Sequence, residues 1–277
     1  MEHSDCRLNP QMSLIWRAWR FLQREGAGAL ARQAFRLLRS RLRLSRQRRI
    51  VFRHFLNRLR FRAVADPHKV IWVRPDDIEF TVVTSITAIP TDPGQVRGGS
   101  WDLDLVRVRD TVKYLGVRQH FEDGVAWEQT CLFGWLVKHL AQGPVDRCHD
   151  VEDVKRRCNS IDVLYRSIVE NGFLLPSECG VRDDGRRDFV RVHIGRSGQL
   201  IFSGGGNHRL AIAKLLGIEL IPVKVVVRHK QWQQLRDKVA TQLREGSLRD
   251  SLNPDVGHPD LQDILAFREK TRTGGVL

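Results

Sequence analysis

Residues 203–216 place three consecutive glycines directly before an expected helix whose first residues are Asn207, His208 and Arg209. Glycines adopt backbone angles closed to other residues and leave the main chain open to a bulky ligand. A helix start offers unpaired N–H groups and the positive end of the helix dipole, both of which favour an anion. The Arg209 guanidinium suits phosphate oxygens, and Asn207 and His208 are shorter donors. The segment predicts a phosphate-binding loop with the binding residues Gly204, Gly205, Gly206, Asn207, His208 and Arg209.

Two common phosphate motifs are excluded for this loop. No Gly-Lys-Ser/Thr follows the glycines at the spacing of a Walker A loop, and the segment lacks the GxGxxG pattern of dinucleotide folds. Taken alone, the segment also fits an ordinary glycine turn in which Asn207 caps a helix and a His-Arg pair is solvated. The surrounding elements decide between these interpretations.

The elements around the loop are predicted from periodicity. Residues 150–172 have apolar side chains at helical spacing and end in Asn-Gly, which is typical of a helix terminus. Alternating runs at 189–194 and 199–202 are joined by a Gly-Arg-Ser-Gly turn, which predicts a hairpin. A helix over about 207–216, a strand over 221–227 and a helix over 229–245 complete the unit. The expected fold class is α+β.

Motif order over residues 155–230 resembles the ParB/sulfiredoxin superfamily. Sulfiredoxins carry Gly-Gly-Cys-His-Arg where this chain has Gly205-Gly206-Asn207-His208-Arg209. Free serine kinases related to ParB carry Asp-Gly-His-His-Arg, and ParB proteins carry a Gly-Glu-Arg-Arg box that holds nucleotide phosphates. The resemblance implies a small mixed sheet with packed helices, and a nucleotide such as ATP, ADP or CTP as the ligand. Asn207 replaces the sulfiredoxin cysteine, which excludes sulfinic acid repair through that thiol, and Gly205 replaces the kinase aspartate.

Any reaction at the loop needs groups from elsewhere in the chain. Asp102 follows a glycine-rich stretch and is the first candidate carboxylate, Glu128 is the second, and His208 completes the set of candidate catalytic residues. Carboxylates of this kind assist phosphoryl transfer by binding Mg²⁺, which would accompany the nucleotide. Asp162 and Tyr165 are further candidates, and each of these residues also fits an ordinary surface or capping role. No protein metal-ligand set is predicted, because Cys148, His149 and Cys158 match no zinc spacing.

Charge divides the chain of 277 residues sharply. Residues 1–62 hold 16 Arg, no Lys and three acids, a net charge of +13, whereas the other 215 residues carry a net charge of +1. We expect three parts: an Arg-rich amphipathic helical segment (1–62), a ParB/sulfiredoxin-like domain (63–245, core 155–230) and a polar tail (246–277). An apolar stripe flanked by Arg suits a helix in a membrane interface, and it equally suits a helix docked on its own protein.

Three functions remain open from the sequence. The first is a nucleotide phosphate-binding protein that acts as a phosphotransferase or nucleotidase. The second is a ParB-like module that binds DNA or RNA through residues 12–62, although no helix-turn-helix spacing is visible. The third is a nucleotide sensor held at an anionic membrane surface by the same residues. Five cysteines without a CxxC pair and the lack of a long apolar run favour a cytoplasmic protein, peripheral at the membrane under the third hypothesis.

Overall fold

A computed structural model describes residues 46–83, 92–173, 189–247 and 257–266. The chain divides into two compact units, Met1–Arg49 and Ile50–Leu277. The first unit is described only at its end, where α3 (Arg46–Arg60) begins, so the fold below is that of the second unit. The helices expected between residues 12 and 45 lie outside the described residues.

The second unit is built on a seven-stranded mixed sheet, which confirms the α+β class. The strand order is β1-β7-β5-β6-β2-β4, and β3 also pairs with β7. The β5–β6 pair is antiparallel and forms the expected hairpin, while β5 and β7 are parallel. The strands are β1 (Val70–Val73), β2 (Phe80–Val82), β3 (Gln95–Arg97), β4 (Leu105–Arg107), β5 (Val190–Ile194), β6 (Leu200–Phe202) and β7 (Ile221–His229).

Strand β7 is the centre of this sheet, and all of its residues are buried. One edge of β7 pairs with β5, and the other pairs first with β1 and then, beyond Lys224, with β3. A strand covered on both edges and both faces is mostly apolar, which explains the valines at 223 and 225–227, and the buried charge of Arg228 is paired with Asp260. The expected strand at 221–227 is therefore confirmed and is two residues longer.

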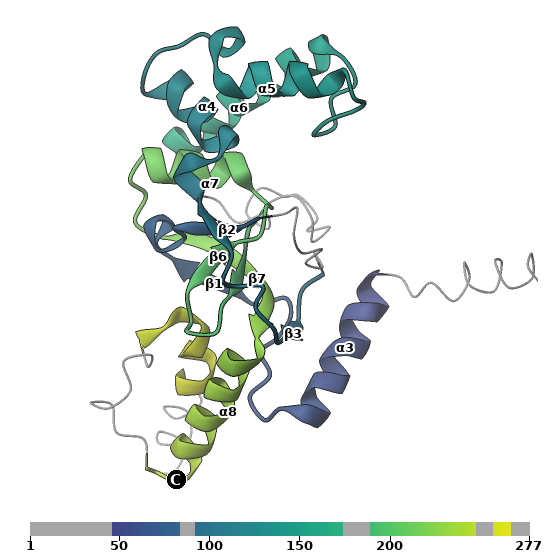
Figure 1. The fold of residues 1–277 in the computed structure, drawn as a ribbon. Coiled ribbons are helices and arrows are strands. Elements are labelled where there is room, and N and C mark those ends of the chain that lie inside the picture. The colour runs from purple at the N-terminus through teal and green to yellow at the C-terminus, as the bar shows by residue number, and fades with distance from the viewer. Residues whose placement is uncertain (1–45, 84–91, 174–188, 248–256, 267–277) are drawn as a thin grey trace, which may run out of the picture. The chain divides into compact units, whose positions relative to one another are not determined.

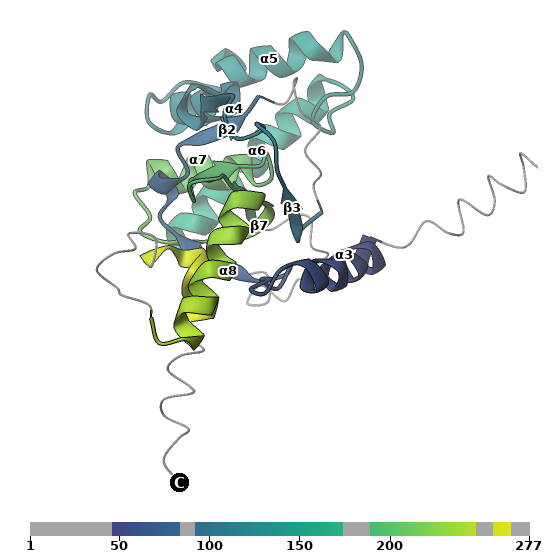
Figure 2. The same cartoon turned by 60° about the horizontal axis from the view of Figure 1, so that its bottom comes forward.

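The helices lie on two sides of the sheet. Figures 1 and 2 show α4, α5 and α6 grouped with α7, and α8 on the other side. The side chains of Thr111, Thr130 and Asp150 cap the first turns of α4, α5 and α6. The helices are α4 (Val112–Phe121), α5 (Cys131–Leu140), α6 (Val151–Asn171), α7 (Asn207–Leu215) and α8 (Lys230–Arg244).

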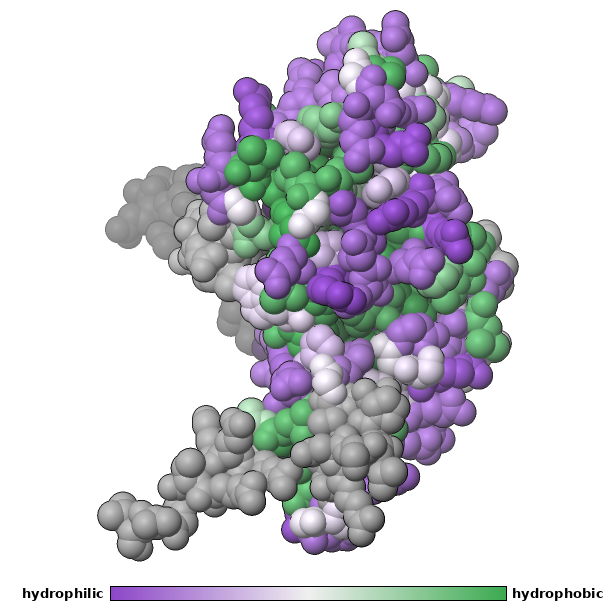
Figure 3. Space-filling view, turned by 90° about the vertical axis from the view of Figure 1, so that its left-hand side faces the viewer, coloured by the Kyte–Doolittle hydropathy of each residue, from purple (hydrophilic) through white to green (hydrophobic). Residues whose placement is uncertain are grey.

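Two hydrophobic clusters hold the layers together. The larger one packs alternate residues of β5, β6 and β7 against α4 to α7. The smaller one lies on the intervening strand residues and contains Val82, Trp101, Ile201, Val226 and Val227. Figure 3 shows hydrophilic residues over most of one face, with hydrophobic residues in patches between them. Within the described residues, no helix is both long and apolar enough to cross a membrane.

The end of the chain is not only a polar tail. Asp260 is fully buried and accepts hydrogen bonds from Arg228 Nε at 2.9 Å and Trp232 Nε1 at 3.0 Å. Burial raises the pKa of Asp260, but Arg228 and Arg236 outweigh burial and hold that pKa well below its usual range. Residues 257–266 are therefore part of the folded unit, because a buried carboxylate between two guanidiniums ties them to β7 and α8.

Candidate functional site

The glycine loop, Ser203–Gly206, connects β6 to α7 and is held by the main chain of Arg191. Ser203 N donates to Arg191 O at 2.9 Å, and Arg191 N donates to Gly205 O at 3.0 Å. Gly204 and Gly206 have φ of +83° and +82°, in the left-handed region that favours glycine. The loop thus turns from the sheet edge into the start of α7, as the sequence predicts.

Close packing explains two of the glycines. A Cβ on Gly205 would lie 1.9 Å from Arg191 Nε, so the absence of a side chain makes room for the Arg191 guanidinium over the loop. A Cβ on Gly206 would lie 2.9 Å from the Cα of Val190, so this glycine allows the loop to pack against the backbone of β5. The loop and β5 therefore form one surface, with the Arg191 side chain on it.

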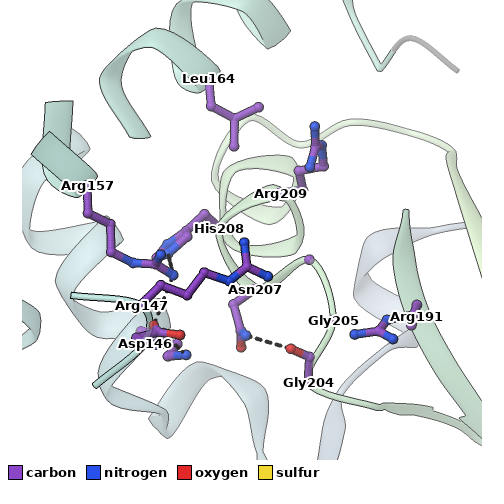
Figure 4. A pocket seen from close by; sticks show the side chains of 12 residues that line it. Asp146, Arg147, Arg157, Leu164, Arg191, Gly204, Gly205, Asn207, His208 and Arg209 are labelled. Carbon is purple, nitrogen blue, oxygen red and sulfur yellow. Dashed lines mark hydrogen bonds and ion pairs between the residues drawn. The ribbon is translucent and has the colours of Figure 1, made fainter. Parts of the chain in front are cut away.

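A cleft of about 260 Å³ opens beside the loop. Figure 4 shows that Arg147 and Arg157 point toward it from one side and Arg191 from the other. These side chains come from the turn before α6, from α6 and from β5. The lining residues are Lys113, Asp146, Arg147, Arg157, Leu164, Arg191, Gly204, Gly205, Gly206, Asn207, His208 and Arg209.

Charge in the cleft is strongly unbalanced. Five lining side chains are cationic, and Asp146 is the one carboxylate among the described lining residues, so the net charge is +4 with His208 neutral. Asp146 Oδ2 forms ion pairs with Lys113 Nζ at 2.8 Å and with Arg157 Nη2 at 2.9 Å. Burial raises the pKa of Asp146, but these two cations lower it more, so the carboxylate remains ionised. The net charge of the lining residues therefore favours an anionic ligand.

The turn that carries Asp146 and Arg147 is strained. Val145 and Cys148 exchange two backbone hydrogen bonds, and the residues between them have φ of 52° and 70°. Two positive φ angles in a two-residue turn are the mark of type I′, where Asn-Gly is the usual sequence. An Asp-Arg pair costs roughly 1 kcal/mol or more per residue in this conformation. Such strain at a cleft favours a functional role for the two side chains.

His208, near the start of α7, contacts α6 and has a neutral imidazole. Its Nε2 lies 3.4 Å from the Arg157 guanidinium, which can only donate, so Nε2 accepts and the ring proton is on Nδ1. Within the described residues, Nδ1 is buried without a hydrogen-bond partner. Burial, followed by the charges of Arg157 and Lys113, lowers the pKa of His208 to about 3. A base of this strength is poorly matched to proton transfer near neutral pH, so a donor role fits better than catalysis.

The other predicted binding residues occupy different positions at the loop. Asn207 Nδ2 donates to Gly204 O at 2.8 Å and so closes the loop rather than capping the helix in the usual sense. Arg209 lines the cleft, but in Figure 4 its side chain leaves α7 on the side away from Gly204 and Asn207. All six residues predicted from the glycine segment line the same cleft.

Two predicted catalytic carboxylates are not brought to this cleft. Asp102 is 1% exposed and holds Arg196 in the β5–β6 turn, with Nε–Oδ2 and Nη2–Oδ1 distances of 3.0 and 2.7 Å. Arg196 follows Arg191 by five residues, a separation of roughly 16 Å in extended chain. Glu128 is exposed in a short 3-10 helix (Trp127–Gln129). Asp102 therefore has a structural partner, and neither carboxylate lines the cleft.

The further candidates also have other contacts. Asp162 accepts from Trp127 Nε1 at 2.9 Å and lies 3.2 Å from His120 Nε2. The Tyr165 ring stacks on Phe121 with centroids 3.9 Å apart. Neither residue lines the cleft. No group of three or more His, Cys, Asp or Glu in the described ranges could hold a metal ion.

Five lining residues were not identified from the sequence: Lys113, Asp146, Arg147, Arg157 and Arg191. Those on helices resemble ordinary solvated charges, since nothing in their spacing marks a ligand. Arg191 gave no clear signal, because an alternating strand at 189–194 is expected to have a polar side chain there, and its place beside the glycine loop follows from hydrogen bonds of the folded chain. The turn at Asp146 and Arg147 gave none either, because Asp tolerates positive φ but Arg is not typical of it.

A series of alanine substitutions in the loop should separate the effect of backbone strain from that of steric contact. Gly206→Ala would place an alanine at a left-handed φ and bring its Cβ against the backbone of Val190. We therefore expect a loss of about 2 kcal/mol or more in the free energy of unfolding. Gly204→Ala has strain but no atom within 4 Å, and we expect about 1 kcal/mol. Gly205→Ala meets only the end of a flexible side chain, and we expect less than about 1 kcal/mol. Urea unfolding of the three variants measures this order, and equal losses would contradict it.

Relief of the turn strain should stabilise the protein. Arg147→Gly replaces a residue at φ 70° with the one best suited to that angle, so the free energy of unfolding should rise by about 0.5 to 1 kcal/mol. Arg147→Ala is the matched control, because it removes the same guanidinium and keeps the strain. Thermal unfolding compares them. A glycine variant no more stable than the alanine variant would show that the turn is unstrained.

His208 should make stability depend on pH. Its folded pKa of about 3 lies below the ordinary value near 6.5, so the unfolded state binds the proton first as pH falls. The contribution is complete above about pH 6.5 and is lost toward pH 3. Between pH 7 and pH 5, His208→Gln should therefore lose about 2 kcal/mol less free energy of unfolding than the wild type, as measured by urea titrations. The pKa of buried His193 is lowered in the same way, so the variant keeps part of the pH dependence of the free energy of unfolding. A variant with the same pH dependence as the wild type would contradict the lowered pKa of His208.

Comparison of the chain with protein-family models, with curated proteins and with solved structures finds no match. The geometry of the cleft is therefore the basis for the function argued below.

Proposed function

We propose that the cleft binds the phosphate groups of a nucleotide. The observation that carries this proposal is a cleft that is lined by five cationic side chains and lies beside a glycine loop at the start of α7. Helix starts and arginine forks are the two commonest protein devices for phosphate, and here they occur together. Arg147 and Arg191 supply planar donors on opposite sides of the loop, so a phosphate between them can be held from both sides.

Size and lining favour the phosphate end of the ligand over its base. The volume of about 260 Å³ is below the usual range for a whole drug-sized ligand, roughly 300 to 1,000 Å³. Leu164 is the one apolar side chain among the described lining residues, and none of them is Phe, Tyr or Trp. Because the lining offers no large aromatic ring for a base to stack on, we expect the phosphates to dominate affinity and the base to contribute little selectivity.

The sequence motif supports the same proposal independently. Gly205-Gly206-Asn207-His208-Arg209 resembles the segment with which ParB/sulfiredoxin-like proteins hold nucleotide phosphates. We therefore propose a ParB/sulfiredoxin-like core for residues 155–230. Asn207 closes the loop where sulfiredoxins have their reactive cysteine, so this chain keeps the binding geometry without that thiol.

The lining residues do not fit a magnesium ion held by the protein. Asp146 is bound by two cations, and oxygen ligands for Mg²⁺ come normally from carboxylates that are free to coordinate. Any Mg²⁺ would arrive on the nucleotide. We do not extend the proposal to a phosphotransferase or nucleotidase, because His208 is a weak base and the carboxylates Asp102 and Glu128 do not line the cleft.

Calorimetric titration of ATP, ADP and CTP tests the proposal. Each should bind the wild type, with and without Mg²⁺, and Arg191→Ala and Arg147→Ala should each weaken binding about tenfold or more through loss of charge-assisted hydrogen bonds. Arg74→Ala is the charge-matched control, since Arg74 is exposed and pairs with Asp77 outside the cleft. Its affinity should equal that of the wild type.

Inorganic tripolyphosphate separates phosphate recognition from base recognition. It should compete with all three nucleotides, whereas adenosine and cytidine should not. Competition by the nucleosides alone, or equal weakening by Arg74→Ala and Arg191→Ala, would contradict the proposal.

A further inference from the structure

Helix α3 presents an apolar face to solvent. Val51, Phe52, Phe55 and Leu59 are 56–70% exposed, and their spacing places them on one side of the helix. Single exposed apolar residues are common in folded proteins, but four large ones in a continuous stripe are not. The exposure therefore needs a physical explanation.

The opposite side of α3 is the one that packs on its own protein, and it does so largely through polar groups. Asn57 Nδ2 donates to Gly94 O at 2.9 Å, and Arg53 Nη1 donates to Pro93 O at 3.2 Å. Ile50 and Asn57 are the buried residues of the helix. An amphipathic helix normally buries its apolar side, so this packing is reversed and leaves the apolar stripe available.

Arginine lies at one border of the apolar stripe. At 100° per residue, Arg58 falls next to Val51 at that border, whereas Arg60 falls near Arg53, toward the side that packs on the protein, and both are exposed. Residues 1–62, which include α3, hold 16 Arg and three acids. An apolar stripe on a strongly basic segment is typical of helices that lie in a membrane interface, where apolar groups enter the acyl boundary and arginines contact lipid phosphates.

We propose that α3 is a membrane-docking helix whose partner is the surface of an anionic lipid bilayer. A nucleic acid backbone would engage the arginines but leave Phe52 and Phe55 in water, because its phosphates offer no apolar surface. A bilayer satisfies both the charge and the apolar stripe. The proposal depends on α3 alone and is independent of nucleotide binding in the cleft.

Vesicle flotation of the full chain tests the proposal. The protein should float with phosphatidylcholine vesicles that contain phosphatidylserine and bind pure phosphatidylcholine more weakly, with the difference removed by high salt. The double variant Phe52→Ser, Phe55→Ser should lose binding by about tenfold or more. Val163→Ser, Val169→Ser on α6 is the matched control, because these side chains are 59% and 56% exposed, and it should float like the wild type.

A second variant tests the exposed arginines at the end of α3. Arg58→Gln, Arg60→Gln should reduce flotation with anionic vesicles and leave the weak binding to neutral vesicles unchanged. Thermal unfolding should show that all variants fold, since every substituted residue is exposed.

Several outcomes would overturn the proposal. They are no flotation of the full chain, equal losses in the α3 and α6 variants, preferential binding to DNA that depends on the same arginines, or a dimer that dissociates when Phe52 and Phe55 are replaced. The last two results would identify α3 as a nucleic acid or self-association surface instead.

Discussion

The candidate site depends on the ion pairs that Asp146 forms with two cationic side chains. Five cationic side chains within one cleft repel one another, and Asp146 offsets one unit of this charge by ion pairs with both Lys113 on α4 and Arg157 on α6. Its carboxylate thereby links two helices beside the glycine loop. The same pairs keep it ionised despite burial, so the tie persists over a wide pH range. One carboxylate lowers the cost of assembling the cations and still leaves a strong positive potential for a ligand.

The site concentrates unfavourable backbone conformations near this charge. Asp146 and Arg147 both have positive φ, and the loop opposite them requires Gly204 and Gly206 in the same region. An Asn-Gly turn would form the same hairpin more easily but could not supply the carboxylate and the guanidinium. The chain therefore keeps less stable residues where their side chains are needed, and the tightly packed sheet around β7 compensates for the loss.

Sequence patterns predicted those parts of the fold that depend on local periodicity. The hairpin, α6, α7 and β7 follow from alternation, helical spacing and glycine stops, and the glycine loop follows from the residue types at the start of α7. Strands β3 and β4 have three residues each and pair with β7 and β2, which are distant in sequence, so no local signal marked them. Asp102 illustrates a related limit of sequence patterns. A carboxylate beside glycines fits catalysis, but the partner that determines its role, Arg196, is 94 residues away in sequence.

Helix α3 shows the same limit from the other direction. From the sequence, docking of the helix on its own protein and binding of the helix to a membrane are alternatives, because each is expected to use the apolar stripe. In the structure the helix docks through Arg53 and Asn57, whose side chains donate to the backbone carbonyls of Pro93 and Gly94. Polar docking leaves the stripe exposed, so the two roles use opposite faces and do not compete. A helix that docks in this way is already ordered before it meets a bilayer, so membrane binding would not have to include the full entropy cost of folding it.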